Sequence, residues 1–477
     1  MKRYKIFIYG FLFLFSINIF AQGKDLSLND ALNFALEGND LINASKQQKE
    51  FAKYEKKAAK GNMFPHLYVE GSVTRINEPI ILSLADARAA VIGSNVATYS
   101  ALGGPNPEQF KQLLESKIPA FDMKFQDELF YNLSANLVLP LYTGGKISAN
   151  SKAKETEYEI SKMQYDTTVN STITSVIENY FTAKLAQEAM KIRANYLEDI
   201  NKHCTNAQKL FDVGMISKTN KLRADVALKE AQREYDKSVR DYELSLVVLS
   251  NVIGESITED NNLSTNLNLI EELKDITFYL QTSYSNNITL KALNKKQTML
   301  QQKTKSIKAE FLPTVALFGK YEIYQDDLTV FEPDWAAGIK AKLDIFNGGS
   351  STNEYKAYSA QQEALKLNIE NASKLIATAV KKYHHEAETA KQQYESLQSS
   401  MELTEENLKL YKKSFEEGLA TSIEVIDAEL ALEKVNLDQL KAIYEYNVAY
   451  AKLVDICNLS KNLINIDILG DSNDDEE

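Results

Sequence analysis

The sequence predicts a mainly α-helical protein with a smaller β-strand part, built from two tandem copies of one unit. Three observations predict this fold class: an internal repeat, long stretches without helix-breaking residues, and four short segments in which apolar and polar side chains alternate. A repeated unit of this kind usually cannot close a hydrophobic core alone.

The repeat is visible as residues that recur at a constant offset. The Gly144-Gly145 pair recurs 204 positions later, at 348–349, and Gly214 recurs as Gly418. Upstream, Pro65 recurs as Pro313 at an offset of 248, so the first copy carries 44 additional residues. Further pairs are Asn39 and Asn287, Phe211 and Phe415, Leu228 and Leu432, Tyr242 and Tyr446, and Leu249 and Leu453.

Residues 1–21 are expected to be a cleaved secretory signal. Lys2, Arg3 and Lys5 precede an apolar run of fifteen residues, which is too short for a spanning helix. A retained membrane anchor is the alternative. Removing the signal changes the net charge from −12 to about −15. An acidic chain of this kind argues against a nucleic-acid partner, which needs a basic face.

Long helices are expected wherever proline and glycine are missing. From Lys146 to Ile253, and again from Ser350 to Cys457, the chain has no proline and one glycine. These stretches predict helices over 146–213 and 216–253, and over 350–417 and 419–457. Apolar residues seven apart indicate coiled-coil packing, although an ordinary helical bundle is an alternative. Shorter helices, about 26–62 and 277–310, open the two copies.

Strands are expected over 67–73, 129–141, 315–323 and 335–345, where apolar residues occupy every second position. A period of two fits a half-buried strand, and it also fits a barrel strand that faces lipid. Small barrels need about eight strands. Since open strand edges are not tolerated in lipid, several chains would have to close the sheet together: two chains give eight strands and three give twelve.

The repeat divides the chain into segments. We expect a first repeat over 22–254, with an inserted loop at about 76–128, and a linker over 255–276. A second repeat follows over 277–460, and a C-terminal belt segment with an acidic tail over 461–477. The inserted loop contains two short helical patterns, over 84–92 and 108–116, and is expected to face outward.

Several of these segments resemble the TolC-type outer-membrane efflux protein family. The resemblance lies in the opening Leu26-Ser-Leu-Asn-Asp-Ala-Leu segment, in the glycine turns Phe211-Asp-Val-Gly and Phe415-Glu-Glu-Gly, and in the Gly144-Gly145 turn with its repeat. It extends over essentially the whole chain after the signal.

The resemblance implies a homotrimer in which a long coiled-coil α-helical barrel carries a transmembrane β-barrel, with four strands from each chain and twelve in the trimer. Such a protein is the outer-membrane exit duct of a tripartite efflux or type I secretion system. Its partners would be a periplasmic adaptor, an inner-membrane pump and outer-membrane lipid. No cofactor, metal or catalytic residue is implied, and the chain is not expected to be an enzyme.

The resemblance also implies which residues carry function. The two helical tips would contact the adaptor, through Val213, Gly214 and Met215 and through Gly418, Leu419 and Ala420. Glu424 and Asp427, three residues apart on one helical face, would form acidic rings at a periplasmic constriction. A glycine that merely ends a helix, and charges that merely face solvent, are the alternative interpretations.

Two other classes of protein are alternatives. A periplasmic coiled-coil scaffold without a pore would not need four alternating strand segments. A secreted hydrolase would need a catalytic constellation, and none is visible in the sequence: His384 and His385 are adjacent, whereas helical zinc ligands prefer a spacing of four.

Overall fold

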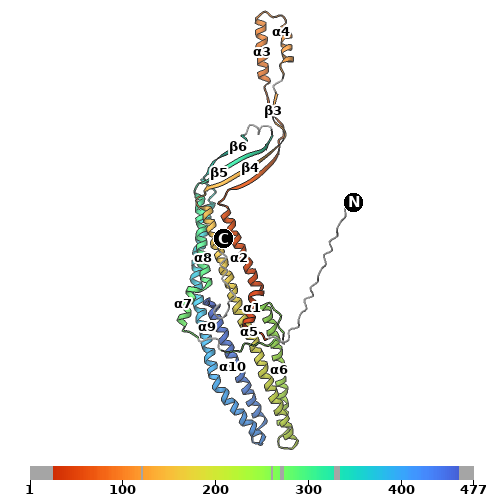
Figure 1. Ribbon diagram of the computed structural model, residues 1–477, viewed down its shortest axis with the longest axis vertical. Coiled ribbons are helices and arrows are strands. Elements are labelled where there is room, and N and C mark those ends of the chain that lie inside the picture. Colours follow the sequence, from red (N-terminus) through yellow and green to blue (C-terminus); the bar gives the residue numbers. More distant parts are fainter. Residues whose placement is uncertain (1–24, 120–121, 259–260, 269–272, 327–332, 461–477) are drawn as a thin grey trace, which may run out of the picture. The chain divides into compact units, whose positions relative to one another are not determined.

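The structure is a computed structural model that describes residues 25–119, 122–258, 261–268, 273–326 and 333–460 (Figure 1). The expected signal, 1–21, and the expected C-terminal segment, 461–477, lie outside these residues. Helices and strands alternate in the order that the repeat predicts, and the described part is mainly helical. Within it, no helix combines the length and the apolar character that a membrane span requires.

The four long helices match the glycine and proline pattern closely. Helix α5 spans Lys146–Asp212 and α6 spans Lys218–Ile253, while α9 spans Ser350–Glu416 and α10 spans Ser422–Ile456. Each pair is one hairpin broken at its only glycine. In Figure 1, α5 with α6 and α9 with α10 join through short turns at the lower edge of the view.

The helices that open the two copies are each broken once, so the expected continuous helices over 26–62 and 277–310 were wrong in this detail. Helices α1 (Leu28–Gly38) and α2 (Asp40–Gly61) meet at Asn39. Helices α7 (Ile276–Asn286) and α8 (Ile288–Lys308) meet at Asn287, its repeat partner. A short 3₁₀ turn, Ala309–Phe311, follows α8.

The asparagines at these breaks make the same bonds in both copies. The side-chain oxygen of Asn39 accepts from the backbone N–H of Ile42 at 3.3 Å, and that of Asn287 accepts from the backbone N–H of Leu290 at 3.0 Å. The Asn39 amide donates to the Val252 carbonyl at 3.0 Å. The Asn287 amide likewise donates to the Ile456 carbonyl, at 2.8 Å. Asparagine therefore caps the second helix and satisfies a carbonyl at the end of a long one.

The structure divides into two compact units, and the first holds most of the hydrophobic core. This unit comprises residues up to Phe51, Glu159–Lys295 and the chain from Leu365 onward. Its largest cluster includes Val169, Ile173, Tyr180 and Leu249. The hydroxyl of Tyr180 donates to the carbonyl of Leu26 at 2.7 Å, which fixes the first described segment against α5.

The second unit, Ala52–Tyr158 and Lys296–Ala364, contains an antiparallel four-stranded sheet. Its strands are β1 (His66–Arg75), β4 (Leu129–Tyr142), β5 (Thr314–Gln325) and β6 (Trp335–Lys342), in the order β1-β4-β5-β6. All four expected strands are therefore present, although the last ends three residues early. Figure 1 shows β4, β5 and β6 side by side.

The register gives this sheet two different faces. Asn136 pairs with Lys320 and Tyr68, and Ser134 pairs with Glu322, which puts these polar side chains on one face. The alternate positions, on the other face, are mostly apolar or aromatic. They include Leu67, Val69, Val73, Tyr131, Leu133, Leu137, Leu317, Tyr321, Trp335 and Ile339.

The insertion in the first copy is more ordered than an irregular loop. Strands β2 (Ile80–Ser83) and β3 (Asp122–Gln126) pair as an antiparallel ribbon that the alternation did not predict. The two helices are longer than expected, since α3 spans Ala85–Ala101 and α4 spans Pro107–Lys117. The rings of Tyr99 and Phe110 stack between the two helices, with centroids 4.1 Å apart. Helices α3 and α4 are labelled at the upper end of Figure 1.

The strand-to-helix turns explain the repeated glycine pair. Gly144 has a φ of 64° and Gly145 of 86°, which L-residues with a side chain rarely adopt. A Cβ atom on Gly144 would also lie 2.8 Å from the carbonyl oxygen of Ala309. At Gly144, glycine is thus required both by the backbone angle and by the close approach of the neighbouring segment; at its repeat Gly348, with a φ of 68°, the backbone angle alone requires it.

Candidate functional site at the helical tips

Both hairpins turn through the same hydrogen-bonded motif. At the first tip, the N–H of Met215 donates to the Leu210 carbonyl at 2.8 Å and the N–H of Gly214 donates to the Phe211 carbonyl at 3.0 Å. Gly214 has a φ of 75°. This is a Schellman turn, in which a left-handed glycine lets two bonds satisfy the last carbonyls of a helix.

The second tip repeats the motif. Leu419 donates to the Ser414 carbonyl at 2.8 Å, and Gly418, with a φ of 74°, donates to the Phe415 carbonyl at 3.0 Å. The recurring Phe-x-x-Gly pattern is therefore a turn signal that works through the backbone.

The two tips lie close together in the first unit. A Cβ atom on Gly418 would lie 3.8 Å from the Met215 methyl carbon. Beneath the turns, Ala207 and Ala224 of the first hairpin pack with Phe415 and Val425 of the second in one buried cluster. The outer surface nevertheless stays apolar and exposed. Val213, Met215 and Leu419 are exposed, whereas Ala420 is half-buried.

The carboxylate of Glu424 is hydrogen-bonded to Thr421, at the start of α10. Its carboxylate accepts from the backbone N–H of Thr421 at 2.7 Å and from the Thr421 hydroxyl at 2.8 Å. These two bonds lower the pKa of Glu424 below its ordinary value. The Thr421-x-x-Glu424 spacing is a capping-box signal that the sequence already carries.

Asp427 lies in a different setting from Glu424. It is exposed and lines a groove between α6 and α10, together with Arg223, Leu222 and Ile423. Among the described residues, no ion pair joins Arg223 to either acid. The structure therefore places the two acids close in sequence on α10, with one carboxylate engaged in capping and the other facing the groove.

Near the tips lies an ionic cluster that the sequence did not single out; its Glu429 is buried, whereas Lys412 and Asp199 are half-buried. Lys412 of α9 approaches Glu429 of α10 to 2.6 Å and Asp199 of α5 to 2.9 Å. Burial raises the pKa of Glu429, and Lys412 only partly offsets it. Burial lowers the pKa of Lys412, but its bonds to both acids outweigh this and leave the pKa raised.

A histidine completes the packing here. The Nε2 atom of His203 lies 2.7 Å from the hydroxyl of Ser422, and both residues are buried. Its ring stands 4.7 Å from the ring of Phe415. Burial, with the nearby charge of Lys412, lowers the pKa of His203 to about 4, so the imidazole is neutral at ordinary pH. The His203–Ser422 bond thus ties the first hairpin to the start of α10.

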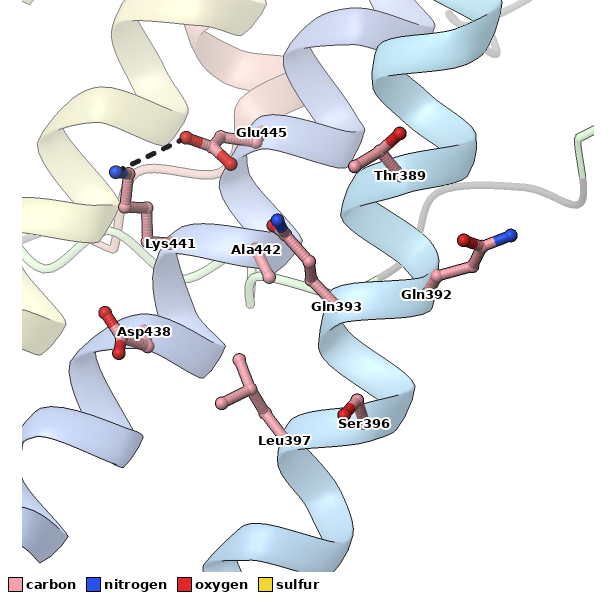
Figure 2. Close-up of a pocket in the computed structure, with 9 residues that line it drawn as sticks. All are labelled: Thr389, Gln392, Gln393, Ser396, Leu397, Asp438, Lys441, Ala442 and Glu445. Atoms are coloured by element: carbon pink, nitrogen blue, oxygen red, sulfur yellow. Dashed lines mark ion pairs between the residues drawn. The ribbon is translucent and has the colours of Figure 1, made fainter.

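A polar groove of about 680 Å³ lies between α9 and α10, farther from the tips (Figure 2). Gln393 and Ser396 of α9 line it, as do Asp438 and Lys441 of α10. Lys441 also pairs with Glu445 at 3.6 Å, as the dashed line in Figure 2 marks. The lining contains no nucleophile with an adjacent base. In the described ranges, no cluster of histidine, cysteine or acidic residues could hold a metal ion.

Comparison with known proteins assigns the fold to a family. The family model described as outer membrane efflux protein matches residues 120–255 and 279–458. The chain is 21% identical over 400 residues to outer membrane protein TolC of Vibrio cholerae, covering 79% of this chain and 87% of the relative. It is 19% identical over 290 residues to the alkaline protease secretion protein AprF of Pseudomonas aeruginosa, covering 58% and 59%.

Solved structures share the same fold. The CmeC outer membrane channel of Campylobacter jejuni superposes with a TM-score of 0.71 at 16% identity, covering 91% of this chain and 86% of that one. A CusC structure reaches 0.73 at 14% identity, covering 91% and 93%. Since the family model covers well over half of the sequence, this chain belongs to the outer membrane efflux protein family, whose members are outer-membrane channels and not enzymes.

Proposed function

We propose that this chain is the outer-membrane exit duct of a tripartite efflux or type I secretion system. In this function it carries substrates from an inner-membrane pump and a periplasmic adaptor to the outside. The repeats 22–254 and 277–460 would supply matching halves of the duct wall. The names of its relatives fit both uses, since one is a secretion protein and several are channels.

The two-faced sheet carries this proposal. Its apolar face is not covered by the described chain, and Leu67 is 75% exposed, Ile339 67% and Trp335 67%. An exposed apolar face of this extent needs an apolar environment. A polar face opposite, with Asn136, Lys320 and Glu322, is what a strand presents to a water-filled lumen.

The edges of the sheet point to several subunits. Within the described residues, no other strand pairs with the outer edge of β1 or of β6. Such edges are too costly in lipid to stay open. Three copies joined edge to edge would give a closed sheet of twelve strands, whereas one copy is too small to close. The homotrimer and its barrel are thus parts of the proposal.

The tips supply the other end of the duct. The exposed Val213, Met215 and Leu419, around Gly214 and Gly418, offer an apolar surface for the adaptor. Asp427, with Glu424 beside it, would place acidic groups around the periplasmic constriction. Because the Glu424 carboxylate is held by Thr421, Asp427 is the better candidate for the ring that faces passing ions.

Planar-bilayer conductance tests the channel and its acidic constriction together. The full-length protein should form pores that prefer cations, because carboxylate rings favour cations over anions. The Asp427→Asn variant should lose more of this preference than Glu424→Gln. A wild type without conductance rejects the channel, and an unchanged reversal potential in both variants rejects only the ring.

The competing function, a periplasmic scaffold without a pore, gives a different result on extraction. A scaffold leaves isolated membranes in high salt, whereas a protein whose strands lie in lipid needs detergent. The exposed apolar sheet face favours detergent extraction. Release by salt alone would favour the scaffold.

A further inference from the structure

Lysines recur at the same place in both repeats, just before the sheet begins. At the offset of 248, Lys57 corresponds to Lys305 and Lys60 to Lys308. Lys60 lies six residues before the first residue of β1, and Lys308 lies six residues before the first residue of β5. Helix α8 carries six lysines and no acidic residue, although the whole chain has a net charge of −12. This basic charge is therefore local.

These four lysines have no acidic partner among the described residues, whereas several lysines close to them do. Lys56 pairs with Glu155 at 3.3 Å, and Lys154 pairs with Glu55 at 2.8 Å. Lys146 pairs with Glu310 at 2.8 Å. By contrast, the four repeated lysines are exposed. The contacts that two of them make are with aromatic rings: Lys57 lies 5.6 Å from the ring of Tyr54 and Lys308 lies 5.1 Å from that of Tyr355.

Between these lysines and the sheet, every connection of the chain exposes large apolar side chains. The register brings the first residues of β1 and β5 and the last residues of β4 and β6 to the same end of the sheet. At this end of the sheet, the side chain of Phe64 is 66% exposed and that of Phe346 is 86% exposed. The other exposed apolar residues there are Met63, Leu141, Tyr142, Phe311, Leu312 and Ile345.

This order is the profile of a membrane interface. The apolar sheet face comes first, then a band of aromatic and aliphatic side chains, then unpaired lysines within two helical turns. Lysine stems lie along apolar surface while their ammonium groups reach the headgroup layer. An anionic lipid surface attracts each such lysine by about 1 kcal/mol.

We propose that Lys57, Lys60, Lys305 and Lys308 bind the phosphate groups of anionic phospholipids in the membrane leaflet on the helical side of the sheet. The inference rests on the proposed function, in which the sheet lies in the outer membrane. Lys57 with Lys60, and Lys305 with Lys308, lie three residues apart and so share a helical face. Each pair can therefore hold one headgroup between two ammonium groups.

Native mass spectrometry of the full-length oligomer tests the site. The protein is released from nanodiscs that contain equal amounts of phosphatidylglycerol and phosphatidylcholine. The number of molecules of each lipid that stay bound to the oligomer is then measured. Wild type should retain phosphatidylglycerol preferentially. Replacing all four lysines by glutamine should reduce this preference by about fivefold for each lysine that contacts lipid. Replacing them by arginine should preserve it, since the charge remains.

The matched control removes four other exposed lysines, Lys218, Lys229, Lys237 and Lys413, each to glutamine. Its net charge change is the same, yet its lipid preference should equal that of wild type. An equal loss in both variants, or no preference in wild type, overturns the proposal.

Two further outcomes separate this proposal from others. A wild type that conducts ions but shows no lipid preference rejects the lysine site and leaves the channel intact, whereas a wild type without conductance rejects the channel itself. The carboxylates of the cell-wall polymer could also attract lysines. If the glutamine variant loses binding to isolated cell-wall sacculi but keeps its lipid preference, the partner is the wall and the lipid proposal is wrong.

Discussion

At the scale of single residues, the role of each charged side chain near the tips depends on the groups that bond to it. Glu424 and Asp427 were expected to play the same role, three positions apart on one helix, although only Glu424 stands at the capping-box spacing from Thr421. The structure separates them, because Thr421 engages Glu424 in a helix cap while Asp427 lies in an open groove. Lys412 gains two acidic partners, on α10 and α5, that lie far from it in sequence.

His203 should make the stability of the tip depend on pH. Its pKa is about 4 in the folded chain and 6.5 when unfolded, so the unfolded state binds a proton first as the pH falls. Its contribution is therefore fully present above pH 6.5 and is lost between pH 6.5 and 4, by at most about 3 kcal/mol. The midpoint temperature of thermal unfolding should be measured for the detergent-solubilised protein at neutral and at acidic pH. The difference between these two temperatures should be smaller in His203→Gln than in wild type.

The exposed His385 is the control for this measurement. His385→Gln should leave the pH dependence as in wild type. If His203→Gln also leaves it unchanged, the buried imidazole does not control acid stability.

At the scale of elements, the opening helices of both repeats break at an asparagine that joins three segments. Asn39 and Asn287 each cap a helix and donate to the carbonyl at the end of a long helix. The same chemistry in both copies explains why the residue recurs. The strand-to-helix turns recur for a comparable reason, since only glycine adopts their backbone angles without strain.

Replacing either asparagine by alanine should destabilise the junction. Loss of the cap costs about 1 kcal/mol, and the Val252 or Ile456 carbonyl loses its donor as well. Hydrogen exchange should quicken in the first turn of α2 in Asn39→Ala and of α8 in Asn287→Ala. The exposed Asn43→Ala is the control, and equal exchange in all three variants would contradict the role given to the junction.

At the scale of the whole molecule, the two glycine tips are proposed to bind the adaptor. The loss of adaptor binding in a tip variant can be distinguished from the effect of backbone strain by a control glycine elsewhere in the chain. Gly214→Leu forces a side chain at a φ of 75°, where nothing lies within 4 Å of the new Cβ atom. Gly103 offers the same strain in the insertion, with a φ of 79° and no neighbour within 4 Å. Co-purification of the adaptor with the membrane-extracted protein is the measurement.

Gly214→Leu should weaken adaptor capture, and Gly103→Leu should not, because only the first alters the tip surface. Both variants should still be extracted from the outer membrane in the same oligomeric form. Equal capture by the two variants would mean that the first tip is not the docking surface.

Much of the fold was determined by sequence alone. The long helices follow from where proline and glycine are missing, and the strands follow from a period of two, because local geometry depends on nearby side chains. The Schellman turns follow from Phe-x-x-Gly. The β2-β3 ribbon was missed because four- and five-residue strands carry too little alternation to stand out from a proline-containing loop.

Tertiary structure alone decided which charged residues meet across different helices and which have no acidic partner. Lys412, Asp199 and Glu429 meet only because three helices pack together, and the four unpaired lysines differ from paired ones only through what the fold places beside them. A charge interacts according to distance and burial, and neither is encoded by spacing along the chain. The sequence therefore determined the order and bounds of most helices and strands, whereas tertiary packing determined which charged side chains are paired and which are not.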